Sequence, residues 1–168
     1  MISSYYDYFK KQVGAKFNLD WVRKDSDFIY NQLRHVRKIV PFDTDLNAPV
    51  LEIGSGMGRL AFLLNEAGFS NYTGLEIDSE AQKFSQNLGF QSFNFINQEI
   101  KDFAKQNNEQ RFSIVFCFET LEHLEQPIQG LMAISSLIKG ERLFIGNTPY
   151  PFKKILCLMK LICLFYTL

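Results

Sequence analysis

The chain has 168 residues, a length that suits one domain with a sizeable hydrophobic core. Its hydrophobic content of 46% excludes an intrinsically disordered chain, and the balance of 18 basic against 18 acidic residues excludes a general attraction for nucleic acid. The three cysteines have no paired or metal-ligand spacing, and the N-terminus lacks a signal-peptide pattern, so a cytoplasmic protein is predicted.

Residues 1–45 are predicted to form a helical cap outside the main fold. Tyr5 and Phe9 fall on one face of a first helix, and Ser26 is placed to cap a second helix that ends before Pro41. Such helices would either lie over a ligand site or only pad the fold.

Apolar strand patterns alternate with helical patterns through residues 46–150, which we interpret as the core. Right-handed crossovers between such units give an α/β fold with a doubly wound, mostly parallel sheet and helices on both faces. The strands are predicted at 49–53, 71–76, 91–96, 112–118 and 142–147, and the helices at 57–67, 79–88, 100–106 and 127–139.

A glycine-rich turn follows the first strand, with the pattern Glu-x-Gly-x-Gly-x-Gly from Glu52 to Gly58. Glycines at 54, 56 and 58 allow a tight turn and let a ligand lie against bare backbone beside a helix N-terminus. The acid two residues before the first glycine would repel a pyrophosphate, but it suits a ligand that carries an ammonium and a sulfonium. The alternative is a flexible turn that binds nothing.

This turn resembles the first motif of the class I S-adenosylmethionine-dependent methyltransferases, and the resemblance runs from about Pro49 to Pro149. It implies a Rossmann-like methyltransferase fold and S-adenosylmethionine as the cofactor. The full sheet of the family has seven strands, of which the last two form an antiparallel hairpin. The residues after Pro149 carry no turn signal for that hairpin, so we expect this sheet to lack the last two strands.

The resemblance also assigns the rest of the cofactor site. Glu76 follows Gly54 at close to the roughly 20-residue spacing of an acid that binds ribose hydroxyls. Glu99 and Ile100 match the family's adenine-binding positions. The alternatives are that Glu76 is a solvated acid after a strand and that Glu99 is an ordinary acid at the start of a helix. The predicted cofactor-binding residues are Glu52, Gly54, Ser55, Gly56, Gly58, Glu76, Ile77, Glu99, Ile100 and Phe118.

The segment Glu119-Thr-Leu-Glu122-His123 follows the fourth strand and resembles small-molecule O-methyltransferases, including those that modify quinone precursors. Methyl transfer to a hydroxyl requires removal of its proton, and histidine accepts protons near neutral pH. We therefore predict His123 as the base, with Glu119 and Glu122 beside it. The segment also resembles metal-dependent RNA 2′-O-methyltransferases, but the only other histidine, His35, lies far upstream, so no metal is predicted. A helix turn in which His123 merely packs is a further alternative.

The tail at 151–168 is apolar almost throughout and is predicted to be a helix. It contains Lys160 and is short of the roughly 20 residues of a membrane-spanning helix. Three interpretations compete: a helix over the sheet edge, an interfacial helix that touches a membrane through 152–168, and a chain cut short before its last strands. We favour the third, with the helix packed on the sheet or on the substrate region.

The sequence thus predicts an enzyme that transfers a methyl group from S-adenosylmethionine to a small-molecule acceptor, through a hydroxyl. Nucleic acid is not expected as a partner. The alternatives are a truncated or non-catalytic cofactor-binding module and a membrane-surface methyltransferase that acts on a lipid or quinone.

Overall fold

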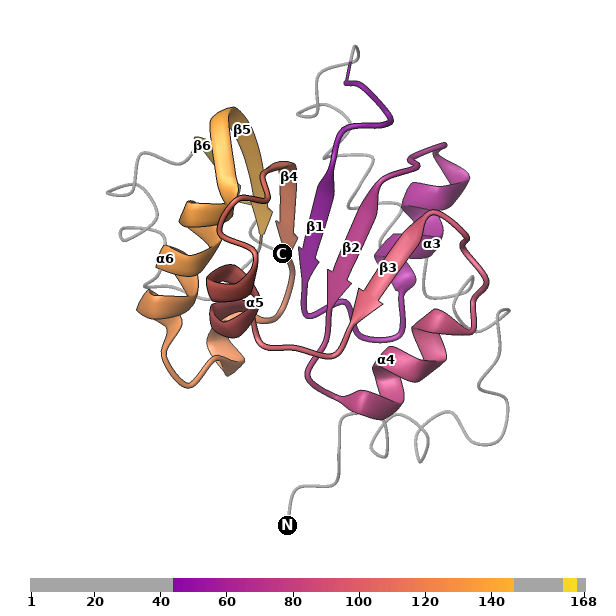
Figure 1. Ribbon diagram of the computed structural model, residues 1–168, viewed down its shortest axis with the longest axis horizontal. Coiled ribbons are helices and arrows are strands. Elements are labelled where there is room, and N and C mark those ends of the chain that lie inside the picture. Colours follow the sequence, from indigo (N-terminus) through magenta and orange to yellow (C-terminus); the bar gives the residue numbers. More distant parts are fainter. Residues whose placement is uncertain (1–43, 147–161, 166–168) are drawn as a thin grey trace.

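Six strands, all parallel, form one sheet in the order β3-β2-β1-β4-β5-β6 (Figure 1). The computed structural model describes residues 44–146 and 162–165. The strands are β1 Val50–Ile53, β2 Tyr72–Leu75, β3 Phe93–Ile96, β4 Phe112–Cys117, β5 Ile138–Gly146 and β6 Ile162–Phe165. The helices are α3 Arg59–Glu66, α4 Ser79–Gln86, α5 Ile100–Gln106 and α6 Pro127–Leu137, with the 3₁₀ helix η1 at Leu121–His123.

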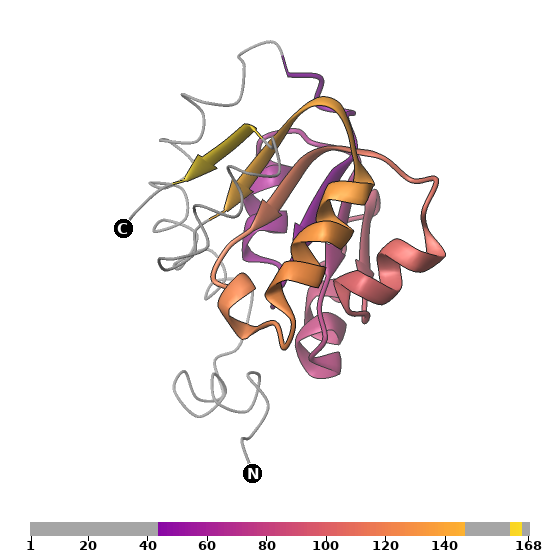
Figure 2. The same cartoon turned by 90° about the vertical axis from the view of Figure 1, so that its left-hand side faces the viewer.

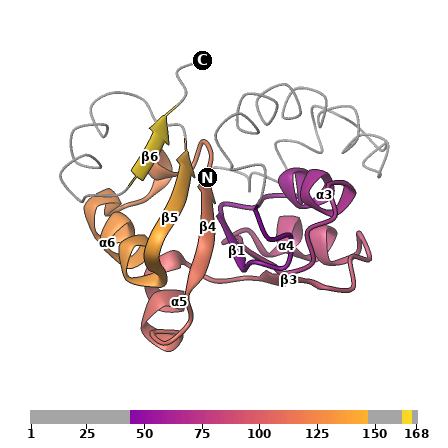
Figure 3. The same cartoon turned by 90° about the horizontal axis from the view of Figure 1, so that it is seen from above.

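The sheet is doubly wound about β1. The chain steps outward from β1 to β2 and β3, then returns to place β4 on the other side of β1. Helices α3 and α4 therefore cover one face and α5 and α6 the other, as the view from above shows (Figure 3). The reversal of direction leaves the carboxyl ends of β1 and β4 side by side, which is where open α/β sheets bind ligands.

Every residue of β1 is buried, because both faces of the strand are covered. Leu51 and Ile53 pack in a cluster with residues of α5 and α6. Val50 and Glu52 alternate with them and so point to the opposite face, where Val50 packs with residues of α3. The run of apolar residues before the glycine turn thus belongs to a central strand, as its sequence predicted.

All five predicted strands are present, but the helix predicted for 151–168 is wrong at Ile162–Phe165. These residues form β6, which pairs in parallel with β5 in the register Leu143↔Ile162 (Figure 2). A strand satisfies the backbone groups that the edge of β5 exposes, and a short apolar run does not distinguish strand from helix by periodicity. Among the described residues no antiparallel hairpin follows β5.

Several other predictions fall wholly or partly outside the described residues. The helical cap lies almost wholly outside the described residues, as do 147–161 and 166–168 of the tail. Strand β5 begins at Ile138, earlier than predicted, and takes residues that the sequence assigned to the end of the preceding helix. In the described part of the chain, no helix has the length and hydropathy needed to cross a membrane.

Candidate functional site

A cleft of about 910 Å³ opens where the carboxyl ends of β1, β2, β3 and β4 meet the loops that follow them. Its wall includes nine predicted site residues from four different loops. They are Gly54, Gly56, Glu76, Ile77, Glu99, Ile100, Phe118, Glu119 and His123. The fold therefore brings together residues that are up to 69 positions apart in the sequence (Gly54 to His123), because parallel strands deliver their carboxyl ends to one edge.

The glycine turn is built on left-handed backbone that side chains rarely adopt. Gly54 has a φ of 74° and Gly56 a φ of 53°. A Cβ on Gly54 would also stand 2.8 Å from Cγ2 and 3.0 Å from Cβ of Thr120, and closer still to its hydroxyl. The first glycine is thus required twice, by its backbone conformation and by the close approach of the loop after β4.

Gly58 and Ser55 are two predicted site residues that do not line the cleft. Gly58 precedes α3, and a Cβ there would stand 2.7 Å from Cδ1 of Leu88, so the third glycine makes room for packing. Ser55 is buried beneath the turn. Both residues belong to the support of the turn, and the cleft wall is formed by the first two glycines of the motif.

Glu76 ties the end of β2 to the glycine turn. One carboxylate oxygen accepts a hydrogen bond from the Gly56 N–H at 2.8 Å, and the other accepts one from the Asp78 N–H at 2.8 Å. The side chain lines the cleft although the residue is only 9% exposed. Burial raises the pKa of Glu76, while the backbone N–H groups that it accepts from oppose that rise. The carboxylate is thereby held in a fixed orientation at the cleft wall.

Glu52 lies behind the turn and is not part of the cleft wall. It is 6% exposed and accepts a hydrogen bond from the hydroxyl of Tyr72, a residue that the sequence analysis missed. Burial raises the pKa of Glu52 from 4.5 to about 8; the bond from Tyr72 opposes this rise and the charge of Glu76 adds to it. The contact could not be predicted from the sequence without the register of β1 and β2. In that register Glu52 pairs with Gly74, which is two residues after Tyr72.

The raised pKa of Glu52 predicts that the stability of the protein falls as pH rises from about 4.5 to about 8. In this window the folded state holds a proton that the unfolded state has lost, so raising pH favours unfolding. We expect the free energy of unfolding of the native chain, relative to Glu52→Gln, to fall by up to about 1.4 kcal/mol per pH unit in urea titrations. A difference that stays constant across this window would contradict the burial of a protonated Glu52.

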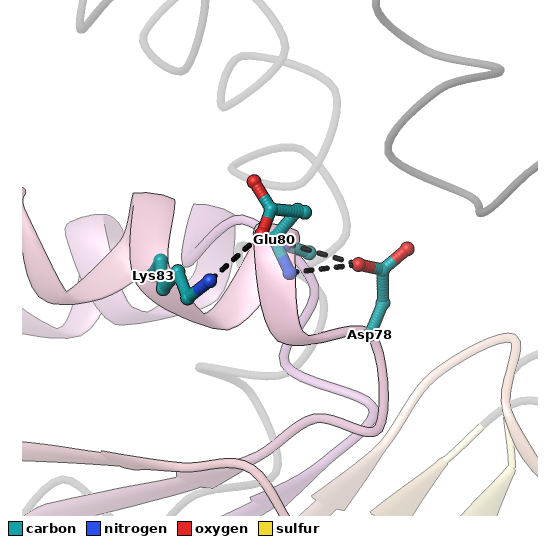
Figure 4. Close-up of polar contacts among 4 residues, drawn as sticks. Asp78, Glu80 and Lys83 are labelled. Carbon is teal, nitrogen blue, oxygen red and sulfur yellow. Dashed lines mark hydrogen bonds and ion pairs between the residues drawn. The ribbon is translucent and has the colours of Figure 1, made fainter.

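The loop after β2 begins helix α4. Asp78 caps the helix, because its side chain accepts hydrogen bonds from the N–H groups of Glu80 at 2.9 Å and Ala81 at 3.3 Å. Glu80 in turn pairs with Lys83 on the exposed side of the helix at 2.8 Å (Figure 4). Ile77 is 73% exposed at the cleft, so an apolar surface stands beside Glu76.

The loop after β3 places Glu99 and Ile100 in the cleft wall. Glu99 stands before the first residue of α5 without capping it through its side chain, and its carboxylate lies 3.4 Å from the Lys101 ammonium. Ile100 is buried. The Glu99 carboxylate, an acceptor, is therefore followed directly by the backbone N–H of Ile100, which is the order of groups that the predicted adenine contact requires.

The loop after β4 carries Phe118, Glu119 and His123 into the cleft. Glu119 has a φ of 46°, a strained conformation for a residue other than glycine. Thr120, also missed from the sequence, anchors this loop: its hydroxyl lies 2.8 Å from the Phe118 carbonyl oxygen and 3.2 Å from that of Ile53. The loop is thus fastened to β1 immediately before the glycine turn.

Glu122 does not line the cleft with its neighbours. One of its carboxylate oxygens is buried without a hydrogen-bond partner among the described residues, and its charge helps burial to raise the pKa of the Cys117 thiol. In residues 44–146 and 162–165 no group of three or more His, Cys, Asp or Glu is arranged to hold a metal ion. The alternative in which Glu119, Glu122 and His123 bind a metal together has no support in this geometry.

Residues 44–161 match the family model described as a methyltransferase domain, which covers more than half of the chain. The chain belongs to the methyltransferase domain family. This membership confirms the resemblance to class I S-adenosylmethionine-dependent methyltransferases that the glycine motif indicated, and the strand order confirms the doubly wound fold.

Among curated relatives, this methyltransferase domain is 30% identical over 110 residues to the mitochondrial ubiquinone biosynthesis O-methyltransferase of Dictyostelium discoideum, covering 58% of this chain and 34% of the relative. It is 32% identical over 111 residues to the ubiquinone biosynthesis O-methyltransferase of Vibrio atlanticus, covering 64% of this chain and 46% of the relative. The chain thus spans less than half the length of these two relatives.

Solved structures show the same fold. One is a SAM-dependent methyltransferase from Archaeoglobus fulgidus, with a TM-score of 0.60 and 23% identity over 83% of this chain and 56% of that chain. Another is the magnesium protoporphyrin IX methyltransferase of Synechocystis PCC 6803 with bound SAM, with a TM-score of 0.59 and 21% identity over 82% of this chain and 67% of that chain.

Proposed function

We propose that this methyltransferase domain binds S-adenosylmethionine in the cleft and transfers its methyl group to a hydroxyl of a small molecule. The observation that carries the proposal is the position of Glu76, whose carboxylate is fixed at the cleft wall by the backbone N–H groups of Gly56 and Asp78. A fixed acceptor beside a side-chain-free turn suits a ligand that carries a ribose next to a charged amino-acid chain.

The residues present fit this cofactor at each of its parts. The turn at Gly54 and Gly56 leaves room for the amino-acid chain, and Glu76 offers carboxylate oxygens to the ribose hydroxyls. Ile77 supplies an apolar surface for the adenine ring, and Glu99 an acceptor for its amino group. When bound, the cofactor supplies an electrophilic methyl group on a sulfonium.

His123 is the proposed base on the acceptor side. Its side chain lines the cleft from η1, on the loop that Thr120 anchors beside the glycine turn. Phe118 and Glu119 stand on the same loop and border the space for the acceptor. Holding an acceptor hydroxyl between this loop and the glycine turn would supply orientation, which accounts for about 7–11 kcal/mol of the barrier in well-aligned reactions.

Replacing His123 by alanine is expected to lower kcat by roughly 10²–10⁴-fold, the usual contribution of a general base, while the affinity for S-adenosylhomocysteine is unchanged. Transfer of a radiolabelled methyl group to catechol measures the first quantity, and calorimetry measures the second. Glu125→Gln is the matched control, because Glu125 is two residues away and exposed but outside the cleft wall. An unchanged kcat in His123→Ala would reject the base.

An aromatic or quinone-like acceptor is the substrate class we favour, because the curated relatives are named for ubiquinone biosynthesis. We propose that the protein acts in the cytoplasm, and contact of 152–168 with a membrane stays a prediction from its apolar sequence alone. Binding of S-adenosylhomocysteine without methyl transfer to catechol, simple phenols or a quinol would favour a non-catalytic cofactor-binding module.

A further inference from the structure

A buried tyrosine reaches from β2 to the acid that precedes the glycine turn. Tyr72 is 0% exposed, and its hydroxyl donates a hydrogen bond to Glu52 on β1. The register pairs Val50 with Tyr72 and Glu52 with Gly74, so the phenol spans two residues along the strands to reach Glu52. A Cβ on Gly74 would stand 2.7 Å from the Tyr72 hydroxyl oxygen, so the absence of a side chain there leaves the path open.

Ser55 adds a third polar group to this cluster. Its Oγ is buried and lies 2.8 Å from the same Gly74 Cβ position, and its interaction with the Tyr72 hydroxyl lowers the pKa of that phenol. A phenol, a carboxyl group and a hydroxyl therefore gather directly beneath the turn, outside the cleft wall.

The charges around this cluster oppose a second negative charge. The groups that interact with Glu52 from neighbouring strands are acids or neutral, and the charge of Glu76 helps burial to raise the pKa of Glu52 to about 8. Glu80 and Lys83 on α4 pair with each other on the exposed side. The titratable and charged groups on the packed elements are Tyr72 and Glu76 at β2, Cys117 on β4, Arg59 and Glu66 on α3, and Glu80 and Lys83 on α4.

We propose that Tyr72 is a positioning residue for the amino-acid end of the cofactor, and that binding of the cofactor's ammonium group expels a proton from Glu52. This inference rests on the proposed function, since it takes S-adenosylmethionine to be the ligand. The Glu52 carboxyl group becomes a carboxylate, its proton passes to the solvent, and no other bond changes. Tyr72 stays protonated in both states, because burial raises the pKa of its phenol well above the usual value, and it keeps the carboxyl group oriented.

Calorimetry at pH 7 in buffers of different ionisation enthalpy tests this coupling. S-adenosylhomocysteine, which carries the ammonium, is expected to release close to one proton from the native protein. Methylthioadenosine, which lacks the amino-acid part, is expected to release none. The affinity for S-adenosylhomocysteine should rise by up to about tenfold per pH unit below about pH 8 and level off above it.

Two variants assign the proton. Glu52→Gln should bind S-adenosylhomocysteine without proton release. Tyr72→Phe should retain the proton release, and its affinity for S-adenosylhomocysteine should fall several-fold while its affinity for methylthioadenosine is unchanged. The pH at which the affinity levels off should rise, because the hydrogen bond from Tyr72 lowers the pKa of Glu52. Circular dichroism checks that both variants fold, and the measurements on the native protein stand without them.

Failure of the coupling is distinguishable from failure of the proposed function. If both ligands bind the native protein without proton release, or if Glu52→Gln releases the same proton, the coupling is wrong and cofactor binding stands. If Tyr72→Phe leaves the pH profile unchanged, Tyr72 is not a positioning residue. If neither ligand binds, the proposed function itself is overturned.

Discussion

Gly54→Ala is expected to weaken S-adenosylhomocysteine binding by tenfold or more, whereas Gly89→Ala leaves it unchanged. Both glycines have a left-handed backbone, with φ of 74° and 78°, so both variants bear about 1–2 kcal/mol of strain. Only at Gly54 would the new methyl group also collide with Thr120; no atom lies within 4 Å at Gly89. Overpacking of this kind costs about 1–3 kcal/mol, and it pushes the glycine turn away from the loop after β4.

Thr120→Ala in the Gly54→Ala background separates strain from collision. The double variant loses the hydroxyl and methyl groups that the new Cβ would meet, so we expect it to recover part of the affinity. Urea unfolding of the native protein, the two glycine variants and the double variant measures their free energies of unfolding, and calorimetry measures their affinities for S-adenosylhomocysteine. Equal binding by Gly54→Ala and Gly89→Ala would show that the close approach of Thr120 plays no part in the site.

Glu76→Ala is expected to weaken S-adenosylhomocysteine by roughly 1–3 kcal/mol, the scale of losing charge-assisted hydrogen bonds. The substitution removes the proposed ribose acceptor, and it also leaves the N–H groups of Gly56 and Asp78 without their partner. The affinity of Glu76→Gln should lie between those of the native protein and Glu76→Ala, since an amide keeps one acceptor oxygen. Calorimetry with S-adenosylhomocysteine and with adenosine measures the effect, and both ligands should be weakened because both carry the ribose.

Glu80→Ala is the matched control for the charge of Glu76. Glu80 lines the same cleft, but its carboxylate pairs with Lys83 on the exposed face of α4, where an ion pair contributes at most about 1 kcal/mol (Figure 4). We expect the affinity of this variant to stay within about twofold of the native value. A loss as large as that of Glu76→Ala would mean that the general negative potential of the cleft, and no particular acceptor, holds the ligand.

Much of the cleft wall could be predicted from the sequence because its signals are local. The glycines, the short buried strand and the acid after the second strand lie within segments of a few residues, and a strand–turn–helix unit folds them in only one way. Where the carboxyl groups of Glu52 and Glu122 lie could not be predicted, for a shared reason. A position next to a motif does not reveal whether a side chain points into a cleft or behind it, and the structure leaves both carboxyl groups out of the cleft wall.

The tail shows the same limit at the level of an element. Residues 162–165 read equally well as helix or strand, and the unpaired edge of β5 decides in favour of a strand. Tyr72 and Thr120 had no motif of their own, since their importance arises from the register of β1 with β2 and from the close approach of the β4 loop to Gly54.

The sequence by itself determined the family, the doubly wound sheet and which loops would carry the site, because glycine turns and buried strands are encoded by short stretches of chain. Only the tertiary structure decided which side chains line the cleft, and that Glu52 is buried against Tyr72, where burial raises its pKa to about 8. Orientation and desolvation depend on residues from separate strands that meet only after folding, and no single stretch of sequence contains them.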